Sequence, residues 1–452
     1  MHGILIWTAL APALTLSATE PEPLPVTVAP EAIAVEGFIG YGAEWDPRGY
    51  DLYGVTDAEF AVVQERVEWM RLPVARMMML AKWCYLGEGQ YDWNTREMQL
   101  LYRQLDVCQA LGSTVLLTDW GCEREWVRPP GIEKTDDPRY AEVIATYMDH
   151  LVNAKGYSCI RYFILVNEPN YEIGDFERWA GGLRNLAAAF SQRGLDKQLT
   201  IAGPDHSNAD DWLFKAVDQL KDVLGAYDVH RYASDKDVAP GKLEDYFANQ
   251  WHYARQNDPV ANGKKFIVGE AGMNDYASHP ASNAKIGTHY YGEFMADFAV
   301  QAVQAGSHAV CAWQLDDNSH LDFAWGLWSN KTQGMILRPW FFPWALLARY
   351  VPPGATIYRV ADPAPWVRVL AARKDSGWTF CLVNRGDDGV QIALSAPGEG
   401  TPAARRYVYA PDGFLTGDKG FPQPVDEVGL DFSKPILIDS PGHGVTLLTT
   451  ME

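Results

Sequence analysis

Short apolar segments alternate with longer segments of helical periodicity from about residue 37 to residue 350. The apolar segments have the length of strands and are residues 38–43, 74–79, 114–118, 162–166, 199–202, 227–230, 265–269 and 309–314. Between them, Thr56 and Asp57 precede one apolar stripe at helical spacing, and Asp175 opens another that ends at Gly194. Repeated βα units predict a parallel sheet, and eight of them predict an α/β fold of the (β/α)8 TIM barrel type.

The chain changes character at the turn sequence Pro352-Pro353-Gly354. Short β-type segments separated by Asp- and Gly-containing turns follow it, without helical periodicity, and they predict a C-terminal antiparallel β-sandwich domain. Residues 26–35 also have β character and could add a strand to that domain. We therefore expect a leader at 1–23, an N-terminal β segment at 24–36, the barrel at 37–350 and the β-sandwich at 351–452.

The charge and the N-terminus limit the classes of partner and the location. The net charge of −20 comes from 58 acidic and 38 basic side chains. A surface of this sign repels nucleic acid and anionic lipid, so we expect neither as a partner. Residues 3–16 are apolar but shorter than the roughly 20 residues of a membrane span. With the small residues and Pro-rich stretch that follow, they resemble a secretory signal peptide, which predicts a secreted or periplasmic protein; the alternative is an unstructured N-terminus.

No cofactor or metal site is expected from the sequence. The six cysteines are Cys84, Cys108, Cys122, Cys159, Cys311 and Cys381, and none lies in a Cys-x-x-Cys pair or at metal-ligand spacing from a histidine. Nucleotide-binding motifs and a Gly-x-Ser-x-Gly nucleophile elbow are also absent from the sequence. Cys84 and Cys122 follow neighbouring predicted strands and are the expected disulfide pair; buried free thiols are the alternative.

Two glutamates stand at the ends of predicted strands, where a barrel of this type has its active site. Glu168 follows the segment 162–166, and Glu270 follows the segment 265–269. A buried carboxylate is costly unless it is paired, hydrogen-bonded or catalytic. One such residue could be a structural ion pair, but two at corresponding places predict a catalytic pair.

Glycoside hydrolysis with retention requires such a pair. One carboxyl group gives its proton to the leaving oxygen, and the other attacks the anomeric carbon as a carboxylate; the two lie about 5–5.5 Å apart. They must also titrate differently, because the ionised nucleophile raises the pKa of the acid while hydrogen bonds keep the nucleophile charged.

Asn167-Glu168-Pro169 resembles the Asn-Glu-Pro motif of the clan A glycoside hydrolases. The resemblance implies that Glu168 is the acid/base, that Asn167 binds the 2-hydroxyl of the sugar, and that Glu270 is the nucleophile. Further matches lie at other strand ends and concern Arg76, His230, Tyr232 and Trp313. The resemblance implies that Arg76 supports the nucleophile, that the Tyr232 hydroxyl binds it, and that Trp313 forms the floor under the sugar.

Other polar and aromatic residues at the strand ends are predicted to bind substrate. They are His206, Trp45, Trp120 and Asn170. For the aromatic residues the alternative is loop packing, and for His206 it is a role in anchoring a loop. A β domain beside the barrel also resembles glycoside hydrolase families 30 and 39.

The sequence thus predicts a retaining enzyme that cleaves β-glycosidic bonds of an oligo- or polysaccharide by double displacement. Its expected partner is the carbohydrate substrate, without a cofactor or an obligate protein partner. Two alternatives remain: a non-catalytic carbohydrate-binding protein on the same barrel, and a transglycosylase that uses the same intermediate. The sugar, and endo or exo action, are left open.

Overall fold

The computed structural model describes residues 22–274, 283–319 and 321–452, so most of the leader expected at 1–23 lies outside the described residues. Within the described chain, eight parallel strands close into a barrel, which confirms the predicted fold class. In chain order they are β3 (Gly40–Glu44), β4 (Val74–Met79), β7 (Thr114–Asp119), β8 (Ile160–Ile164), β9 (Thr200–Ser207), β10 (Ala226–Ala233), β11 (Lys265–Met273) and β12 (Ala309–Ala312).

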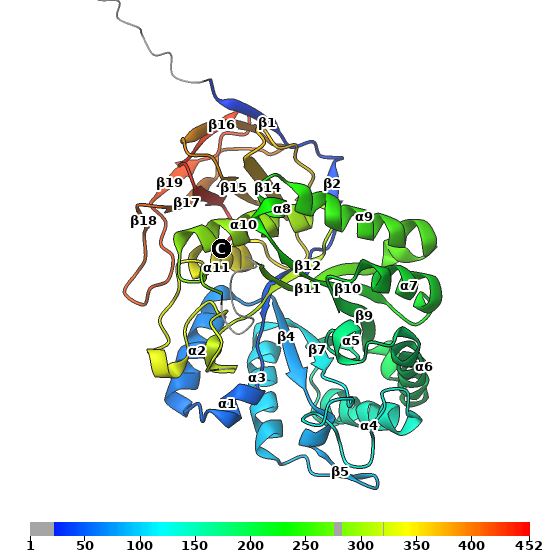
Figure 1. The fold of residues 1–452 in the computed structure, drawn as a ribbon. Helices are drawn as coiled ribbons and strands as arrows, with labels where there is room; N and C mark the ends of the chain where they lie inside the picture. The colour runs from blue at the N-terminus through cyan, green and yellow to red at the C-terminus, as the bar shows by residue number, and fades with distance from the viewer. Residues whose placement is uncertain (1–21, 275–282, 320) are drawn as a thin grey trace, which may run out of the picture.

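Each barrel strand is followed by a helix on the outside of the barrel (Figure 1). The eight helices are α2 (Asp57–Met70), α3 (Arg96–Leu111), α4 (Pro138–Asp149), α6 (Phe176–Arg193), α7 (Asp210–Leu220), α9 (Lys242–Asn257), α10 (His289–Gln304) and α11 (Phe341–Tyr350). Three short helices lie in the loops after β3, β8 and β10; they are α1 (Arg48–Leu52), α5 (Pro169–Glu172) and α8 (Asp235–Val238).

The predicted helix ends are formed by the expected residues. Thr56 caps α2, because its side chain accepts a hydrogen bond from the backbone amide of Glu59 while the Glu59 carboxylate accepts one from the backbone amide of Thr56. Asp175 caps α6, and Gly194 ends it at a φ of 69°, the left-handed conformation that glycine adopts without a steric penalty.

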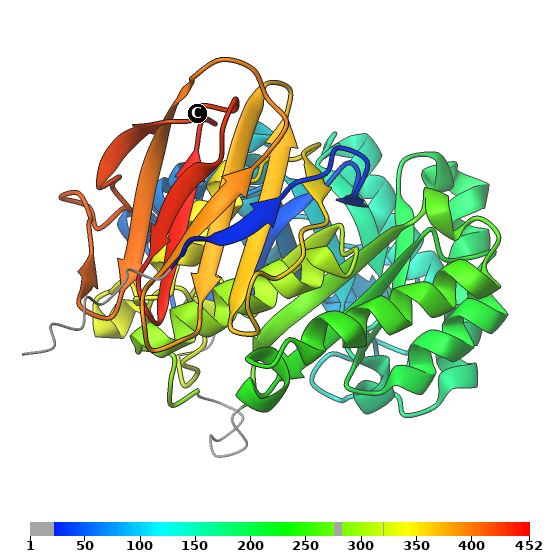
Figure 2. The same ribbon diagram turned by 90° about the horizontal axis from the view of Figure 1, so that it is seen from above.

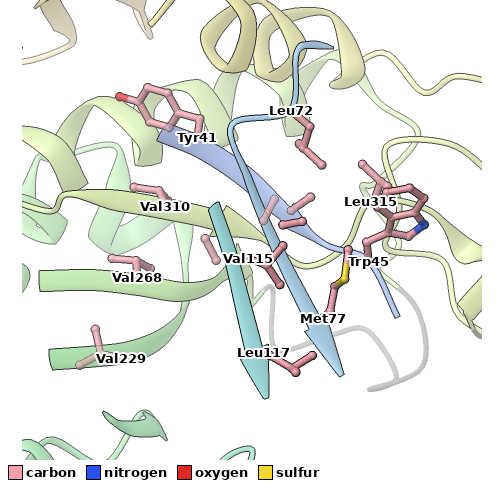
Figure 3. Packing of buried hydrophobic residues seen from close by; sticks show 14 of the residues in the cluster. Tyr41, Trp45, Leu72, Met77, Val115, Leu117, Val229, Val268, Val310 and Leu315 are labelled. Atoms are coloured by element: carbon pink, nitrogen blue, oxygen red, sulfur yellow. The ribbon is translucent and has the colours of Figure 1, made fainter. Parts of the chain in front are cut away.

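The main hydrophobic core lies between the barrel strands and the helices around them. Alternate strand residues such as Tyr41, Met77, Val229 and Val310 point outward into it (Figure 3). A smaller cluster fills the inside of the barrel, with Val74, Leu116 and Ile267 among its members. The barrel is therefore packed and not open, and the polar side chains of a site must gather at one of its ends.

Two sheets form the β domain beside the barrel (Figure 2). The larger sheet contains β2 (Ile33–Val35), β13 (Thr356–Tyr358), β14 (Val367–Lys374), β15 (Gly377–Asn384), β17 (Ala403–Ala410), β18 (Gly413–Phe414), β19 (Asp426–Gly429) and β21 (Gly444–Thr449). The smaller sheet contains β1 (Leu24–Thr27), β16 (Val390–Ser395) and β20 (Ile436–Ser440). The segment before the barrel thus gives one strand to each sheet, as the first strand of the chain pairs with β16 and the second with β13.

The larger sheet is buried on both faces. Along β15, Phe380 packs toward the small sheet, while its neighbour Cys381 packs into the main core. Helix α10 lies between the sheet and the barrel (Figure 1). Arg385 joins the two parts, since its guanidinium lies 2.9 Å from a carboxylate oxygen of Glu293 and 2.7 Å from one of Asp235.

The expected disulfide is not formed. All six cysteines are free and buried, including Cys84 and Cys122, so the alternative of buried thiols describes them. Cys84 instead donates to the carbonyl of Ala81, and Cys122 faces the hydroxyl of Thr135. Among the helices of the described residues, none is long and apolar enough to cross a membrane.

Candidate active site

The predicted site residues come together at the carboxyl ends of the barrel strands. β4 supplies Arg76, the turn after β8 supplies Asn167 and Glu168, β10 supplies His230 and Tyr232, and β11 supplies Glu270. Parallel strands end at one face of a barrel, so residues far apart in the chain become neighbours there.

The turn after β8 fixes Glu168 through an unusual backbone. Val166 and Glu168 have φ values of 70° and 43°, in the left-handed region that side-chain-bearing residues rarely adopt. Between them, the Asn167 amide donates to the carbonyl of Asp119 at 2.8 Å. Such strain persists only where surrounding contacts enforce it, and it occurs frequently at active sites. It turns the Glu168 carboxyl group toward β10.

Glu270 lies at an irregularity of β11. The register with β12 shifts between Val268 and Ala271, which aims Glu270 into the barrel mouth. The preceding Gly269 has no side chain, and a Cβ atom there would lie 2.5 Å from Oδ1 of Asp228. The missing side chain at this position therefore leaves room for the buried carboxyl group of Asp228.

The two glutamates face each other. Single carboxylate oxygens of Glu168 and Glu270 and one ring nitrogen of His230 all lie within 4.8 Å of one another. The Glu168 side chain keeps 22% of its surface exposed, whereas that of Glu270 keeps 4%. Glu168 is thus the carboxyl group that solvent can reach, and Glu270 is enclosed by protein donors.

Arg76 holds three acceptors from inside the barrel. Its Nη1 donates to Oε1 of Glu270 at 2.7 Å, and its Nη2 donates to Oδ1 of Asn167 at 2.8 Å and to Oδ2 of Asp205 at 3.0 Å. The guanidinium is fully buried. A planar fork of this kind fixes several acceptors at once, so it aligns the nucleophile candidate with the residue that precedes Glu168.

His230 and Tyr232 complete the surroundings of the two carboxyl groups. The Tyr232 hydroxyl donates to Oε2 of Glu270 at 2.6 Å. Nδ1 of His230 lies 3.0 Å from Oε1 of Glu168 and 3.4 Å from Oε2 of Glu270. Burial and the charge of Glu270 raise the pKa of Tyr232 well above its ordinary value, so the hydroxyl remains a donor.

Asp205 is a site residue that the sequence did not reveal. It lies at the end of β9 with a φ of 57° and contacts Arg76, His230 and the backbone amide of Glu168. It follows a Gly-Pro pair, which resembles a loop more than a strand end. The only indication in the sequence is its position after a predicted strand, which is also the position of the predicted binding residue His206.

The charges of the site are strongly coupled. Burial raises the pKa of Glu270 above its ordinary value, with a further contribution from Glu168, although His230, Arg76 and the Tyr232 hydroxyl each act to lower it. Burial opposes a charge on Asp205, but Arg76 and His230 outweigh it and hold its pKa below the ordinary value. Burial alone would lower the pKa of His230, yet Asp205 and Glu270 raise it well above the ordinary value.

Two sets of side chains in the described residues have the donor types of a metal site. They are Glu168 with His230 and Glu270, and Asp205 with Asp228 and His230. In both sets, hydrogen bonds already connect members with one another or with the Arg76 guanidinium. His230 contacts Glu168 and Asp205, and Arg76 donates to Glu270 and Asp205. A cation is therefore not needed to explain their proximity.

An aromatic cleft of about 290 Å³ lies at the same face of the barrel. Its lining residues come from the loops after β3, β7 and β12 and are Asp46, Arg48, Trp120, Trp126, Trp313, Gln314 and Phe323. The rings of Trp120 and Trp126 meet edge to face with centroids 5.2 Å apart. Two of the predicted binding residues, Trp120 and Trp313, thus line a common cleft.

Three predicted substrate-binding residues have other surroundings. Trp45 is 1% exposed, stacks on Phe60 and donates to the hydroxyl of Tyr50, so it packs in the core. The Asn170 amide exchanges two hydrogen bonds of 3.1 Å with the backbone of Ser207.

His206 is fully buried. Burial and the neighbouring His230 lower its pKa to about 3, so the ring is neutral. The packing alternative therefore describes Trp45, while the Asn170 amide bonds to the backbone and the His206 ring is enclosed by protein.

Comparison with known proteins gives likenesses of structure only. The chain matches no known family model, and a search of curated proteins finds no match. Among solved structures, a GH30 endoxylanase from Clostridium papyrosolvens C71 has a TM-score of 0.68 and 13% identity, with 95% of this chain and all of that chain covered.

Two further solved structures are similar to the same degree. A GH39 enzyme from Xanthomonas axonopodis pv. citri has a TM-score of 0.64 and 14% identity, with 96% of this chain and 99% of that one covered. An alpha-L-arabinofuranosidase from Thermotoga maritima has a TM-score of 0.64 and 13% identity, with 95% and 100% covered. The barrel with its β domain is therefore the architecture of these glycoside hydrolases, as the resemblance implied.

Proposed function

We propose that this protein is a retaining glycoside hydrolase, with Glu168 as acid/base and Glu270 as nucleophile. The observation that carries the proposal is that one carboxylate oxygen of Glu168 lies within 4.8 Å of one carboxylate oxygen of Glu270. Retaining enzymes hold theirs about 5–5.5 Å apart, whereas inverting enzymes need about 6.5–9.5 Å to admit a water molecule. The separation favours direct attack on the sugar.

The surroundings support the assignment of roles. Arg76 and Tyr232 each donate to a different oxygen of Glu270, which favours its ionised form and orients it for attack. Glu168 is the more exposed of the two, as suits a group that meets a leaving oxygen first and water afterwards. In the first step Glu168 protonates the leaving oxygen while Glu270 bonds to the anomeric carbon. In the second step Glu168 takes a proton from water, which displaces Glu270.

The bond that we propose is cleaved is a β-glycosidic bond in an oligo- or polysaccharide. It rests on the resemblance of Asn167-Glu168-Pro169 to the clan A motif, with Asn167 held by Arg76 beside Glu168. The aromatic cleft with Trp120 and Trp313 supports it, because aromatic rings bind the apolar faces of sugars. Two of the neighbours named above, the endoxylanase and the alpha-L-arabinofuranosidase, are named for different glycosides, so the screen must be broad.

The test combines a substrate screen with two matched variants. Wild-type protein is incubated with plant, algal and microbial polysaccharides and with aryl glycosides, including α-L-arabinofuranosides, and the products are separated by chromatography. Glu270→Gln should abolish turnover. Glu177→Gln, which changes an exposed glutamate of α6, should leave it unchanged.

Azide rescue assigns the nucleophile. In Glu270→Ala, azide can enter the space of the lost carboxylate, and the product should be a glycosyl azide of inverted configuration. Full activity in Glu270→Gln would refute the proposal. Glycan binding without hydrolysis of any glycan would favour the non-catalytic alternative, and longer products at high acceptor concentration would show transglycosylation by the same intermediate.

We also propose that the protein is exported. The support is the apolar N-terminal stretch followed by a Pro-rich segment. Expression of the full chain with its own N-terminus tests this, since export predicts a mature N-terminus near residue 24 outside the cytoplasm. An intact Met1 on all of the protein would contradict it.

A further inference from the structure

We propose that Asp205 is a positioning residue that controls the catalytic proton of Glu168 through His230. The inference deepens the proposed function and depends on it. Three groups on three strands or turns form a continuous row: Asp205 at the end of β9, His230 on β10 and Glu168 after β8. Asp205 reaches Glu168 only through the imidazole and the backbone, and it touches no reacting atom.

The contacts in this row leave little freedom. Oδ1 of Asp205 lies 2.9 Å from Nε2 of His230, and Nδ1 of the same ring lies 3.0 Å from Oε1 of Glu168. Oδ2 of Asp205 accepts from Nη2 of Arg76 at 3.0 Å and from the Glu168 amide at 3.4 Å. Both Asp205 and His230 are fully buried, so water does not compete for these bonds.

The charge of Asp205 determines which nitrogen of His230 carries a proton. Arg76 and His230 hold the pKa of Asp205 low despite its burial, so the carboxylate is ionised and can only accept hydrogen bonds. Nε2 must then be protonated, and Nδ1 is the nitrogen that shares a proton with Glu168. The pair can hold this proton on either atom until the leaving oxygen takes it.

Other charged or titratable groups also surround His230. They are Arg76 on β4, His206 on β9, Asp228 and Tyr232 on β10, and Glu270 on β11. Glu270 raises the proton affinity of His230, and Arg76 lowers it. Asp205 is the strongest of the groups that raise it, so its removal should have the largest effect on the shared proton.

Replacement of Asp205 by asparagine should reverse the tautomer. Two donors, Arg76 and the Glu168 amide, face the position of Oδ2, so the amide oxygen of asparagine must occupy it. The NH2 group then faces Nε2 of His230, which has to give up its proton and accept. Nδ1 becomes a permanent donor to Glu168 and holds it as a carboxylate, the wrong form for an acid.

The experiment measures Asp205→Asn with two kinds of aryl glycoside of the sugar that the wild-type protein cleaves. The alkaline limb of kcat/KM should move down by about one pH unit or more, as for the loss of a charge partner. With a poor leaving group such as phenol, kcat/KM should fall by about 100-fold or more, within the range for loss of general acid catalysis. With 2,4-dinitrophenol, which leaves without a proton, it should change by less than about fivefold.

Asp228→Asn is the matched control. Asp228 is another fully buried aspartate at this face, and burial and Asp205 raise its pKa well above the ordinary value. A pKa shift in this direction favours the protonated form of Asp228, which the neutral amide of asparagine resembles. Its pH profile and leaving-group dependence should match the wild type. Equal losses with both leaving groups in Asp205→Asn, or the same shift in Asp228→Asn, would overturn the proposal.

A measurement on the wild-type protein covers the case in which Asp205→Asn fails to fold. Nitrogen NMR of histidine-labelled protein, assigned by comparison with His230→Gln, should show a proton on Nε2 of His230 across the active pH range. An unprotonated Nε2 would overturn the proposal that Asp205 sets the tautomer of His230. Wild-type protein without activity on any glycoside would instead count against the proposed function and leave the tautomer result intact.

Discussion

Removal of the buried arginine should destabilise the protein and disable the site together. Arg76→Met keeps much of the side-chain volume but removes the guanidinium that binds Glu270, Asn167 and Asp205. Glu270 and Asp205 are then buried carboxylates without their main cation. The loss of stability comes from these two carboxylates. It is limited by the hydrogen bonds from Tyr232 to Glu270 and from His230 to Asp205, which remain in the variant.

We expect Arg76→Met to lower the free energy of unfolding by about 3–5 kcal/mol at neutral pH, the usual cost of removing one partner of a buried ion pair. The deficit should shrink as the pH falls. Asp205 has a lowered pKa in the folded wild type, so its stabilising contribution is present above its unfolded pKa and is lost on acidification through the folded pKa. In the variant, proton uptake by the same carboxyl group on acidification stabilises the folded state relative to the unfolded state.

Urea unfolding followed by tryptophan fluorescence at several pH values measures this deficit. Arg76→Lys is the control, since it keeps the charge but cannot reach three acceptors with a planar fork. It should retain more stability than Arg76→Met and still lose most activity. A deficit below about 1 kcal/mol, or one that grows on acidification, would show that Arg76 does not hold these carboxylates.

Three other predictions concern single contacts. Tyr232→Phe removes the 2.6 Å bond to Glu270, and kcat/KM should fall by about 10- to 150-fold, as for loss of a 1.5–3 kcal/mol charged hydrogen bond; an unchanged kcat/KM would contradict the contact's role. Burial raises the pKa of Asp119 to about 7, so the free energy of unfolding should fall as the pH rises from about 4 to 7 and this carboxyl group loses its proton. In urea titrations, Asp119→Asn should remove up to about 4 kcal/mol of that fall; parallel pH curves for the variant and the wild type would refute this. Arg385→Ala breaks the pairs with Glu293 and Asp235 and should cost about 3–5 kcal/mol of unfolding free energy; wild-type stability would show that these pairs do not join the β domain to the barrel.

The barrel was predictable because its strands are buried on both sides. A run such as residues 74–79 is apolar apart from Arg76, and the structure has β4 over the same residues. The residues at which the strands end near the site were less predictable. β9 runs on to Ser207 through a Gly-Pro pair, and tertiary contacts with Arg76 and His230, which no local pattern encodes, fix Asp205 there.

Aromatic residues and cysteines show the same limit. Trp45 and Trp120 both follow apolar strands in the sequence, but only Trp120 lines the cleft, while Trp45 is enclosed by Phe60 and Tyr50. Cys84 and Cys122 follow neighbouring strands, yet their thiols face Ala81 and Thr135. Direction of a side chain depends on the loop backbone, which the sequence pattern does not specify.

Covalent trapping tests the central claim most directly. An activated 2-deoxy-2-fluoro glycoside of the cleaved sugar should inactivate the wild-type protein, and peptide mass spectrometry should find one glycosyl ester, on Glu270. The same probe should leave Glu270→Gln unmodified. A hydrolytically active protein whose first product has the inverted anomeric configuration, or an ester on a different residue, would contradict the assignment of Glu270 as nucleophile.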